Sequence, residues 1–371
     1  MINRSRIQKM QVTLFQKKRT AIILCAAALA VLAGVLTAIL SSPSKDIAFV
    51  QKMKPGWNLG NTLDAHGLKD PEAVPEKYET YWGNPFTTAE MIAKVKEAGF
   101  NTIRIPVTWY EHMDKAYHID DAWMDRVQQV ADYGIQNGLY VILNAHHDAW
   151  YTPDPANLKK AETVMRAVWG QIAVRFAGYD EHLLFEGMNE PRLIGTEHEW
   201  DEGTPEAREA VNKLNEAFVE TIRASGGKNG ERYLLIPTYC ASTRPEALKA
   251  LVLPKGGRLI VSIHLYRPYD FTLNEAGTAE WSPNSREDTE EIDQAIEDAR
   301  HLFTDRGIPV IITEFGTVDK GNTAARTQWA DYVTQKAGAA HIGCIWWDNS
   351  IYDRCTLQWK YPDIVHALTG K

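Results

Sequence analysis

One pattern of polar and apolar positions recurs along the chain from residue 46 onward: a helix-like segment, a glycine, a short apolar run, and a polar or aromatic loop. The apolar runs are nearly continuous, which is typical of strands that are covered on both faces. Gly99, Gly138 and Gly307 stand where helices would end, and Thr87 with Glu90 fits a capping box. We predict strands at residues 56–59, 102–106, 140–144, 183–187, 233–237, 259–264, 310–314 and 343–347.

Strands that alternate with helices favour a parallel sheet, and eight such units over about 320 residues fit a (β/α)8 TIM barrel. A doubly wound open sheet is the alternative. Its first helix usually opens on Gly-x-Gly-x-x-Gly, and the glycines of residues 56–61 have the wrong spacing. We therefore predict one catalytic barrel over residues 50–371, preceded by a short linker at residues 41–49.

The first forty residues differ from the rest. Residues 1–20 are a basic segment, and no acidic residue precedes Asp46. Residues 21–40 are uncharged and mostly apolar, long enough to cross a bilayer as a helix. They form either a transmembrane signal anchor or a signal peptide, and the lack of a clean Ala-x-Ala site favours the anchor. We expect an extracellular or cell-surface protein that meets the membrane only through residues 21–40.

Charge and cysteine content narrow the choice of partners. Six of the 40 Lys and Arg residues lie in the first twenty positions, so residues 21–371 hold 34 of them against 48 Asp and Glu, a net charge of −14. This charge argues against nucleic acid, anionic lipid and polyanionic substrates. Cys240, Cys344 and Cys355 are too few and too scattered for a disulfide framework. We expect a monomer with no cofactor and no metal.

Polar and aromatic residues stand at the carboxyl ends of nearly all the predicted strands, where the active site of a barrel lies. Glu190 and Glu314 follow two of the apolar runs, and a carboxylate delivered there is costly unless it is used. Packing alone would not place so many polar groups at these positions. The other candidates are Trp57, Asn58, Arg104, His146, His147, Asn189, Tyr239, His264, Tyr266, Trp346 and Trp347.

Two carboxylates among aromatic residues, with no nucleophilic serine elbow, suit glycoside hydrolysis. Tryptophans offer flat apolar faces to sugar rings. Trp57, Trp82, Trp109, Trp150, Trp200, Trp281, Trp346 and Trp347 fall at strand ends or in loops, whereas Trp123, Trp169, Trp329 and Trp359 fall in helical stretches.

Two other classes of protein stay open. Metal-dependent hydrolysis would use the histidines and acids, but the first strand lacks the His-x-His usual in metal-dependent barrels. A surface carbohydrate-binding protein that has lost catalysis would still need the same groove.

Eight motifs follow one another along the chain: 56–64 (GWNLGNTLD), 82–85 (WGNP), 103–109 (IRIPVTW), 144–148 (NAHHD), 185–192 (FEGMNEPR), 262–266 (SIHLY), 313–316 (TEFG) and 346–349 (WWDN). In type and order they resemble glycoside hydrolase family 5, the cellulase family of clan A, and most closely its subfamily 4 endoglucanases. The resemblance covers about residues 50 to 369. It implies a retaining, endo-acting hydrolase of β-1,4-glucan, with xyloglucan, mixed-linkage glucan and mannan as alternative substrates.

The resemblance also implies roles for single residues. Glu190 would be the acid/base and Glu314 the nucleophile. Arg104 would lie beside Glu314 and hold it ionised, whereas Glu190 needs a drier, less cationic setting that keeps it protonated. Asn189 would bind the sugar 2-hydroxyl. The rest of the expected substrate-binding set is Trp57, Asn58, His146, His147, His264, Tyr266, which would contact Glu314, and Trp347, the floor under the ring being cleaved.

One segment departs from the family pattern. Residues 350–354 follow Asn349 at once, where the family usually has a longer loop. We therefore expect the glycone side of the groove to be more open.

Overall fold

The computed structural model describes residues 43–70 and 74–371. Within this part Lys45–Lys371 form one compact unit. The predicted membrane segment at residues 21–40 lies outside the described residues, and no helix within them is long and apolar enough to cross a bilayer. Helix α2 (Lys45–Met53) replaces part of the expected linker at 41–49, which is therefore wrong from residue 45 onward.

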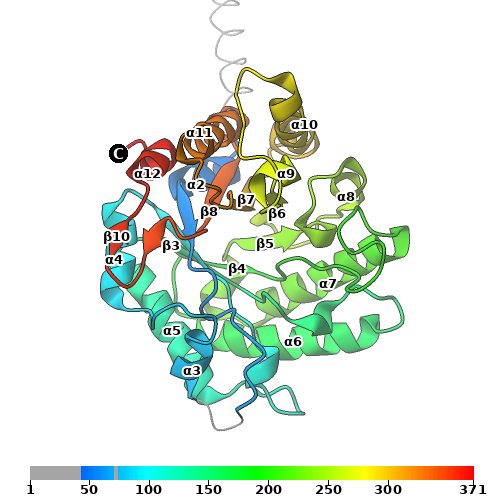
Figure 1. The fold of residues 1–371 in the computed structure, drawn as a ribbon. Helices are drawn as coiled ribbons and strands as arrows, with labels where there is room; N and C mark the ends of the chain where they lie inside the picture. The colour runs from blue at the N-terminus through cyan, green and yellow to red at the C-terminus, as the bar shows by residue number, and fades with distance from the viewer. Residues whose placement is uncertain (1–42, 71–73) are drawn as a thin grey trace, which may run out of the picture. The chain divides into compact units, whose positions relative to one another are not determined.

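Eight parallel strands close into a barrel, as the apolar runs predicted (Figure 1). The ends of the predicted and observed strands differ by no more than one residue, and β1 closes the ring by pairing with β8. The strands are β1 (Gly56–Asn58), β2 (Thr102–Ile105), β3 (Tyr140–Asn144), β4 (Leu183–Glu186), β5 (Leu234–Pro237), β6 (Leu259–Leu265), β7 (Val310–Phe315) and β8 (Gly343–Trp347).

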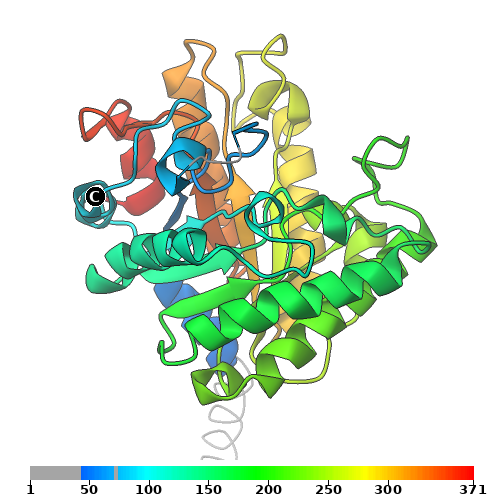
Figure 2. The same cartoon turned by 90° about the horizontal axis from the view of Figure 1, so that it is seen from below.

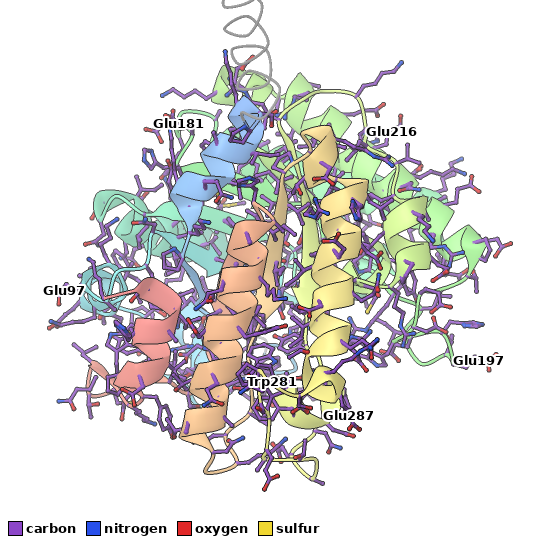
Figure 3. All side chains as sticks on the ribbon, turned by 90° about the horizontal axis from the view of Figure 1, so that it is seen from above. Glu97, Glu181, Glu197, Glu216, Trp281 and Glu287 are labelled. Atoms are coloured by element: carbon purple, nitrogen blue, oxygen red, sulfur yellow. The ribbon has the colours of Figure 1, made fainter. Side chains whose placement is uncertain are left out.

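Helices surround the barrel because the outward-facing strand residues are apolar and need cover. Figure 2 shows α6 and α7 side by side along one flank, and Figure 3 shows α10, α11 and α12 along another. The helices are α4 (Ala89–Glu97), α5 (Asp121–Gln136), α6 (Leu158–Arg175), α7 (Pro205–Ala224), α8 (Pro245–Ala250), α10 (Arg286–Leu302), α11 (Thr323–Ala339) and α12 (Pro362–Thr369), with the short α3 (Pro75–Glu79) and α9 (Tyr269–Thr272) in loops.

The start of α4 corrects one local prediction. Thr88, and not Thr87, is the N-cap, and its hydroxyl accepts the backbone N–H of Met91 at 3.3 Å. The predicted Thr87–Glu90 capping box is therefore wrong by one residue. Thr87 instead donates its backbone N–H to the buried carboxylate of Glu79 at 2.8 Å.

The lower half of the barrel interior is a closed apolar layer. Helix α2 covers it from below and contributes Phe49, Val50 and Met53. Apolar side chains fill this end of the barrel interior, and the polar residues of the site lie at the other end. The strand residues of this layer are Ile142, Leu184, Leu235, Ile260, Ile311 and Ile345.

After β8 the chain forms a small antiparallel hairpin of β9 (Tyr352–Asp353) and β10 (Gln358–Trp359). The Tyr352 and Trp359 rings stack at 4.5 Å and both meet the edge of Trp57. A buried ion pair between Asp348 and Arg354, at 3.1 Å, ties the hairpin to the end of β8. Trp359 is thus a strand residue and not a helical one as predicted.

Candidate active site

A layer of polar side chains fills the barrel directly above the apolar one. Side chains two positions apart on a strand share a face, so Asn144, Glu186, Ser262 and Thr313 each follow an apolar interior residue, as Glu186 follows Leu184. All members are fully buried. This polar layer consists of Asn58, Arg104, Asn144, Glu186, Ser262 and Thr313, from β1, β2, β3, β4, β6 and β7.

Arg104 is the hub of the polar layer. Its Nε donates to Glu186 at 2.7 Å, and its Nη1 donates to Glu314 at 2.7 Å and to Asn58 at 3.0 Å. Its Nη2 donates to the Asn189 amide oxygen at 2.7 Å. Burial disfavours the charge, but the two glutamates outweigh this and raise the pKa of Arg104 above its ordinary value. The guanidinium is therefore a fixed cation beneath the site.

Glu190 and Glu314 face each other above this layer. One oxygen of each carboxylate and one ring nitrogen of His264 all lie within 4.8 Å of one another. Glu314 accepts from Arg104 and from the Tyr266 hydroxyl at 3.0 Å, so both expected neighbours of Glu314 are in place. This close approach fits the pair of carboxyl groups, about 5–5.5 Å apart, of a retaining glycosidase better than the wider pair of an inverting one.

The protonation of the two carboxyl groups differs from the expectation. Burial would raise the pKa of Glu190, but the hydrogen bond from His264 at 2.8 Å and the charges of His264 and Arg192 lower it. Burial raises the pKa of Glu314 against the opposing charges of His264 and Arg104. We predicted a less cationic setting for Glu190, and that prediction is wrong, because a histidine and an arginine both reach it.

His264 lies between the two carboxylates. Burial opposes its charge, but Glu314 and Glu190 raise the pKa of His264 above its ordinary value. Its Nδ1 lies 2.8 Å from Glu190 and 3.6 Å from Glu314. Its Nε2 is buried and has no hydrogen-bond partner among the described residues, so it is free for a ligand hydroxyl. These shifts place the proton of the hydrogen bond on His264, which forms a charged pair with Glu190.

The Trp347 indole forms one wall of the site. It is the inward residue at the end of β8, level with Asn58 across the pair, and it lies parallel to the His146 ring at 5.7 Å. The chain at Gly60 passes so close that a Cβ there would lie 2.6 Å from the indole. A glycine at position 60 is thus required for this position of Trp347.

The Asn144 amide fixes the tautomer of His146. Asn144 Oδ1 accepts the Val107 N–H, so its Nδ2 is the group that faces His146 Nδ1, at 3.0 Å. Nδ1 of His146 is then the acceptor, and the proton of the neutral ring lies on Nε2. Burial lowers the pKa of His146 well below its ordinary value and keeps the ring neutral. Nε2 is 3.9 Å from Glu314 and is a hydrogen-bond donor at the edge of the site.

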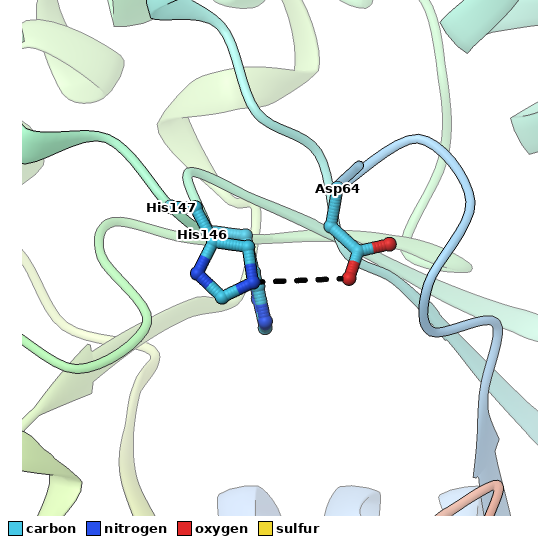
Figure 4. Close-up of side chains that lie close together, drawn as sticks. All are labelled: Asp64, His146 and His147. Carbon is cyan, nitrogen blue, oxygen red and sulfur yellow. Dashed lines mark ion pairs between the residues drawn. The ribbon is translucent and has the colours of Figure 1, made fainter. Parts of the chain in front are cut away.

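Asp64, His146 and His147 form a second group beside the catalytic pair (Figure 4). His147 Nε2 lies 4.0 Å from Asp64, and burial lowers the pKa of His147 to about 4 and raises that of Asp64 to about 6. Two imidazoles and a carboxylate are donor types that divalent metals accept. However, His146 would have to lose its Nε2 proton, which the Asn144 contact holds there, so this set fits hydroxyl recognition better than metal binding.

Two predicted substrate-binding residues do not reach the cleft. Trp57 is fully buried on the outer face of β1, under the β9–β10 hairpin, and its place in the sugar site is corrected. Asn58 faces the barrel interior, where it donates to the Thr313 carbonyl at 2.9 Å and accepts from Arg104. It therefore supports Arg104 and does not touch a ligand.

The other loop tryptophans divide into two groups. Trp109, Trp281 and Trp346 are buried and structural; Trp281, for example, packs on Tyr332 of α11 and donates to the Asp288 carbonyl of α10 (Figure 3). Trp82 is 38% exposed and Trp200 is 61% exposed. These two, with the partly exposed Trp150 and Trp347, are the tryptophans left to meet a ligand. Tyr239, also a candidate, is buried and holds the loop after β4 through Leu193.

Three residues that matter to the site were not predicted. Ser262 lies two positions before His264 on β6, Glu186 is the last residue of β4, and Asn144 opens the motif that contains His146. The period of two along a strand was the available indication, because it places these polar residues on the interior face.

A closed (β/α)8 barrel with two carboxylates at retaining distance and a parallel indole wall defines a glycoside hydrolase. Residues 68–353 match the family Cellulase (glycosyl hydrolase family 5). Endoglucanase 1 of Ruminococcus albus is 47% identical over 340 residues, which cover 88% of this chain and 80% of that protein. The chain therefore belongs to glycosyl hydrolase family 5, a retaining family of clan A.

Solved structures agree with this assignment. A GH5-4 broad-specificity endoglucanase from Ruminococcus champanellensis with bound cellotriose has a TM-score of 0.84 and 42% identity, covering 88% of this chain and 100% of that one. A variant of a family 5 lichenase from Caldicellulosiruptor sp. F32, in complex with cellotetraose, also has a TM-score of 0.84 and 42% identity, covering 89% of this chain and 96% of that one.

Proposed function

We propose that this chain is an endo-acting β-1,4-glucanase that retains the anomeric configuration, with Glu314 as nucleophile and Glu190 as acid/base. The observation that carries the proposal is the Glu190–His264–Glu314 group, in which one atom of each residue lies within 4.8 Å of the others, with the fixed cation Arg104 hydrogen-bonded to Glu314 at 2.7 Å while Arg192 comes only to 3.5 Å from Glu190. A permanent cation stabilises a carboxylate that must attack as an anion. A titratable partner suits a carboxyl group that must give up and regain a proton.

The reaction has two balanced steps. In the first, a Glu314 oxygen forms a bond to the anomeric carbon, the bond to the leaving oxygen breaks, and that oxygen takes the proton of Glu190. In the second, Glu190 removes a proton from water, the water oxygen attacks the same carbon, and Glu314 leaves as a carboxylate. Arg104 and Tyr266 are hydrogen-bonded to Glu314 before either step, so little reorganisation accompanies the change in charge.

His264 supplies the proton that Glu190 needs. His264 and Glu190 form a charged hydrogen bond at 2.8 Å. A sugar that fills the cleft excludes water, and a drier site favours the neutral acid next to a neutral imidazole over the ion pair. The proton then lies on Glu190, where it can reach the leaving oxygen.

The surrounding side chains provide the contacts for the sugar being cleaved. Asn189 gives its amide oxygen to Arg104, so its amide N–H groups are available to the 2-hydroxyl oxygen. His146 Nε2 and His264 Nε2 are further donors, and the Trp347 face is the apolar floor. His147 lies near Asp64, and its ring makes an edge contact with His66, which makes another with Trp82. His147 therefore belongs to the adjoining part of the groove.

β-1,4-Glucan is the favoured substrate because relatives that match most of this chain are named endoglucanases and one solved relative holds cellotriose. The lichenase relative favours mixed-linkage β-glucan as a second substrate. A panel of soluble polysaccharides tests this: we expect rapid loss of viscosity with few new reducing ends on carboxymethylcellulose and lichenan. NMR of the first product should show the β-anomer, and initial α-anomer would refute the mechanism.

We also propose that the catalytic domain acts outside the cell. The support comes from the apolar segment 21–40 in the sequence and from the size of the polymer, which a cell cannot take up intact. Cell fractionation tests it, and full-length protein in the cytosol would contradict it.

A further inference from the structure

A third carboxylate, Glu186, lies below the two facing glutamates and takes no direct part in the proposed reaction. It is fully buried in the polar layer. Its Oε2 accepts from Arg104 Nε at 2.7 Å and from Asn144 Nδ2 at 3.0 Å, and its Oε1 accepts from the Ser262 hydroxyl at 2.5 Å. In all three contacts the Glu186 oxygens are the acceptors, and one of the donors is the Arg104 cation.

Burial of this ion pair is expensive, and a core of apolar residues would fill the same space at no lower stability. The apolar layer directly below shows that the barrel can be filled in that way. The presence of Glu186 is therefore better explained by what it does to the residues that touch the reaction.

We propose that Glu186 is a positioning residue with two effects. In the first part, it shares the Arg104 cation with the nucleophile Glu314. In the second, it acts through Asn144 to fix the His146 tautomer that carries its proton on Nε2. The argument for the first part is the geometry of the guanidinium. Arg104 turns its Nε edge to Glu186 and its Nη1 to Glu314, both at 2.7 Å, so one cation serves two anions. A nucleophile that held the whole cation would be too stable to attack.

The second part follows from the Asn144 amide. Its Nδ2 lies 3.0 Å from both Glu186 Oε2 and His146 Nδ1, while its oxygen accepts the Val107 N–H. The carboxylate can only accept, so it keeps the NH2 group of Asn144 on the side of His146. Glu186 thus holds the His146 proton on Nε2, toward the sugar.

The inference rests on the proposed function, because it needs Glu314 to be the nucleophile. In Glu186→Gln the shape is kept and the charge is lost, so the full field of Arg104 acts on Glu314 and its pKa falls. The acid limb of kcat/KM, which reports the ionisation of Glu314, then moves to lower pH by about one unit. The charged and titratable groups that face Glu314 are Arg104 from β2, His264 from β6, and His146, Glu190 and Tyr266 from the loops after β3, β4 and β6.

The kinetic constants should also divide in a specific way. Glu186 touches no substrate, so KM should change little while kcat falls on the order of 10- to 100-fold, the loss expected for a misplaced catalytic group. Ser262→Ala should shift the acid limb in the opposite direction, to higher pH by a few tenths of a unit. It removes a donor that stabilises Glu186, so the anion opposes the ionisation of Glu314 more strongly.

The chain offers a matched control in a second buried pair, whose hydrogen bonds do not involve the catalytic glutamates or Arg104. Glu79 is fully buried and accepts from Arg126 at 2.8 and 3.0 Å. Glu79→Gln should leave the pH profile and kcat unchanged. Opposite shifts in Glu186→Gln and Ser262→Ala, with none in Glu79→Gln, support the inference.

An unshifted acid limb in Glu186→Gln, or the same shift in the control, overturns it. If Glu186→Gln does not fold, Ser262→Ala decides, and an unmoved limb in that variant overturns the inference. Titration of the 13C-labelled Glu314 carboxyl by NMR gives the same comparison without substrate. A wild-type protein inactive on every β-glucan would refute the proposed function, while the NMR titration would still test Glu186.

Discussion

The contact between Gly60 and Trp347 gives a prediction whose magnitude follows from the structure. A Cβ at position 60 would lie 2.6 Å from two carbons of the indole ring. Unstrained carbon contacts are about 3.5–4.0 Å, so Gly60→Ala must separate the two groups by about 1 Å. Gly60 does not have a positive φ, so the substitution brings no backbone strain of its own.

The loop cannot supply this movement easily. The Gly60 carbonyl accepts from Arg354 at 2.9 Å, and the next two backbone N–H groups are both bound by the Asp64 carboxylate, at 3.0 and 2.7 Å. The Trp347 indole is only partly buried on its cleft side. We therefore expect the indole to move into the cleft and to displace the sugar ring by about 1 Å, which lowers kcat/KM on the order of 10²-fold.

The assay is kcat/KM on a soluble cello-oligosaccharide, with thermal unfolding of the same samples. Gly178→Ala is the control, since a Cβ there meets nothing within 4 Å and the residue has no positive φ. We expect the control to match the wild type. If Gly60→Ala keeps wild-type kcat/KM with its fold intact, the indole does not form the floor of the site, and the account of Trp347 is refuted.

Four further predictions test other parts of the structure. Glu314→Gln should lower kcat by about 10⁴-fold or more with unchanged circular dichroism; substantial turnover would remove Glu314 as nucleophile. His264→Gln should move the acid limb of kcat/KM to higher pH, because the histidine charge lowers the pKa of Glu314; a shift to lower pH would contradict this. Glu79→Ala should cost about 3–5 kcal/mol in urea unfolding, since it leaves the buried Arg126 unpaired, while the activity of the folded protein stays the same. Burial lowers the pKa of His112 from 6.5 to about 3. Below pH 6.5 the unfolded chain therefore binds a proton on this ring that the folded state does not bind. His112 therefore stabilises the fold above pH 6.5 and loses about 2 kcal/mol of that contribution between pH 7 and pH 5; unfolding curves of His112→Phe should lack this loss.

The strands could be predicted closely because the information for them is local. Each is a short apolar run that a glycine or a polar loop bounds, and parallel strands buried on both faces read in this way. The cluster at their carboxyl ends followed from the barrel geometry, which explains why Arg104, Tyr266 and Glu314 meet as predicted. The helix cap at Thr88 shows the limit, because Thr87 and Thr88 are adjacent and only the backbone geometry distinguishes them.

The protonation of the pair could not be predicted, because it depends on distances between separate loops. Arg192 follows Glu190 by two residues, and its Nη1 comes within 3.5 Å of the carboxylate only through the path of the loop after β4. His264 is 74 residues away in sequence and lies at 2.8 Å. A pKa responds to all of these charges at once, so a list of residue types does not give its direction.

The error at Trp57 and the omission of Glu186 have one cause. Adjacent strand residues face opposite ways, so Asn58 and Trp57 cannot both point into the barrel. The register pairs Trp57 with Trp346 on the outer face and Asn58 with Trp347 on the inner face. The alternation that places Trp346 on the outer face also places Trp57 there, and on β4 it places Glu186 inside with Leu184.

The comparison of two buried glutamate–arginine pairs shows why the interior of the barrel is polar near its upper end. Glu79 and Arg126 close on each other, and Arg126 gives its remaining donors to the Thr87 carbonyl and to Gln129. The contacts of this pair therefore reach only residues that hold the fold together. Arg104 instead uses Glu186 as an anchor and extends its other donors to Glu314 and Asn189. A buried ion pair of the first kind contributes little net stability, whereas the second transmits a fixed charge from the barrel axis to the reacting groups, which an apolar layer cannot do.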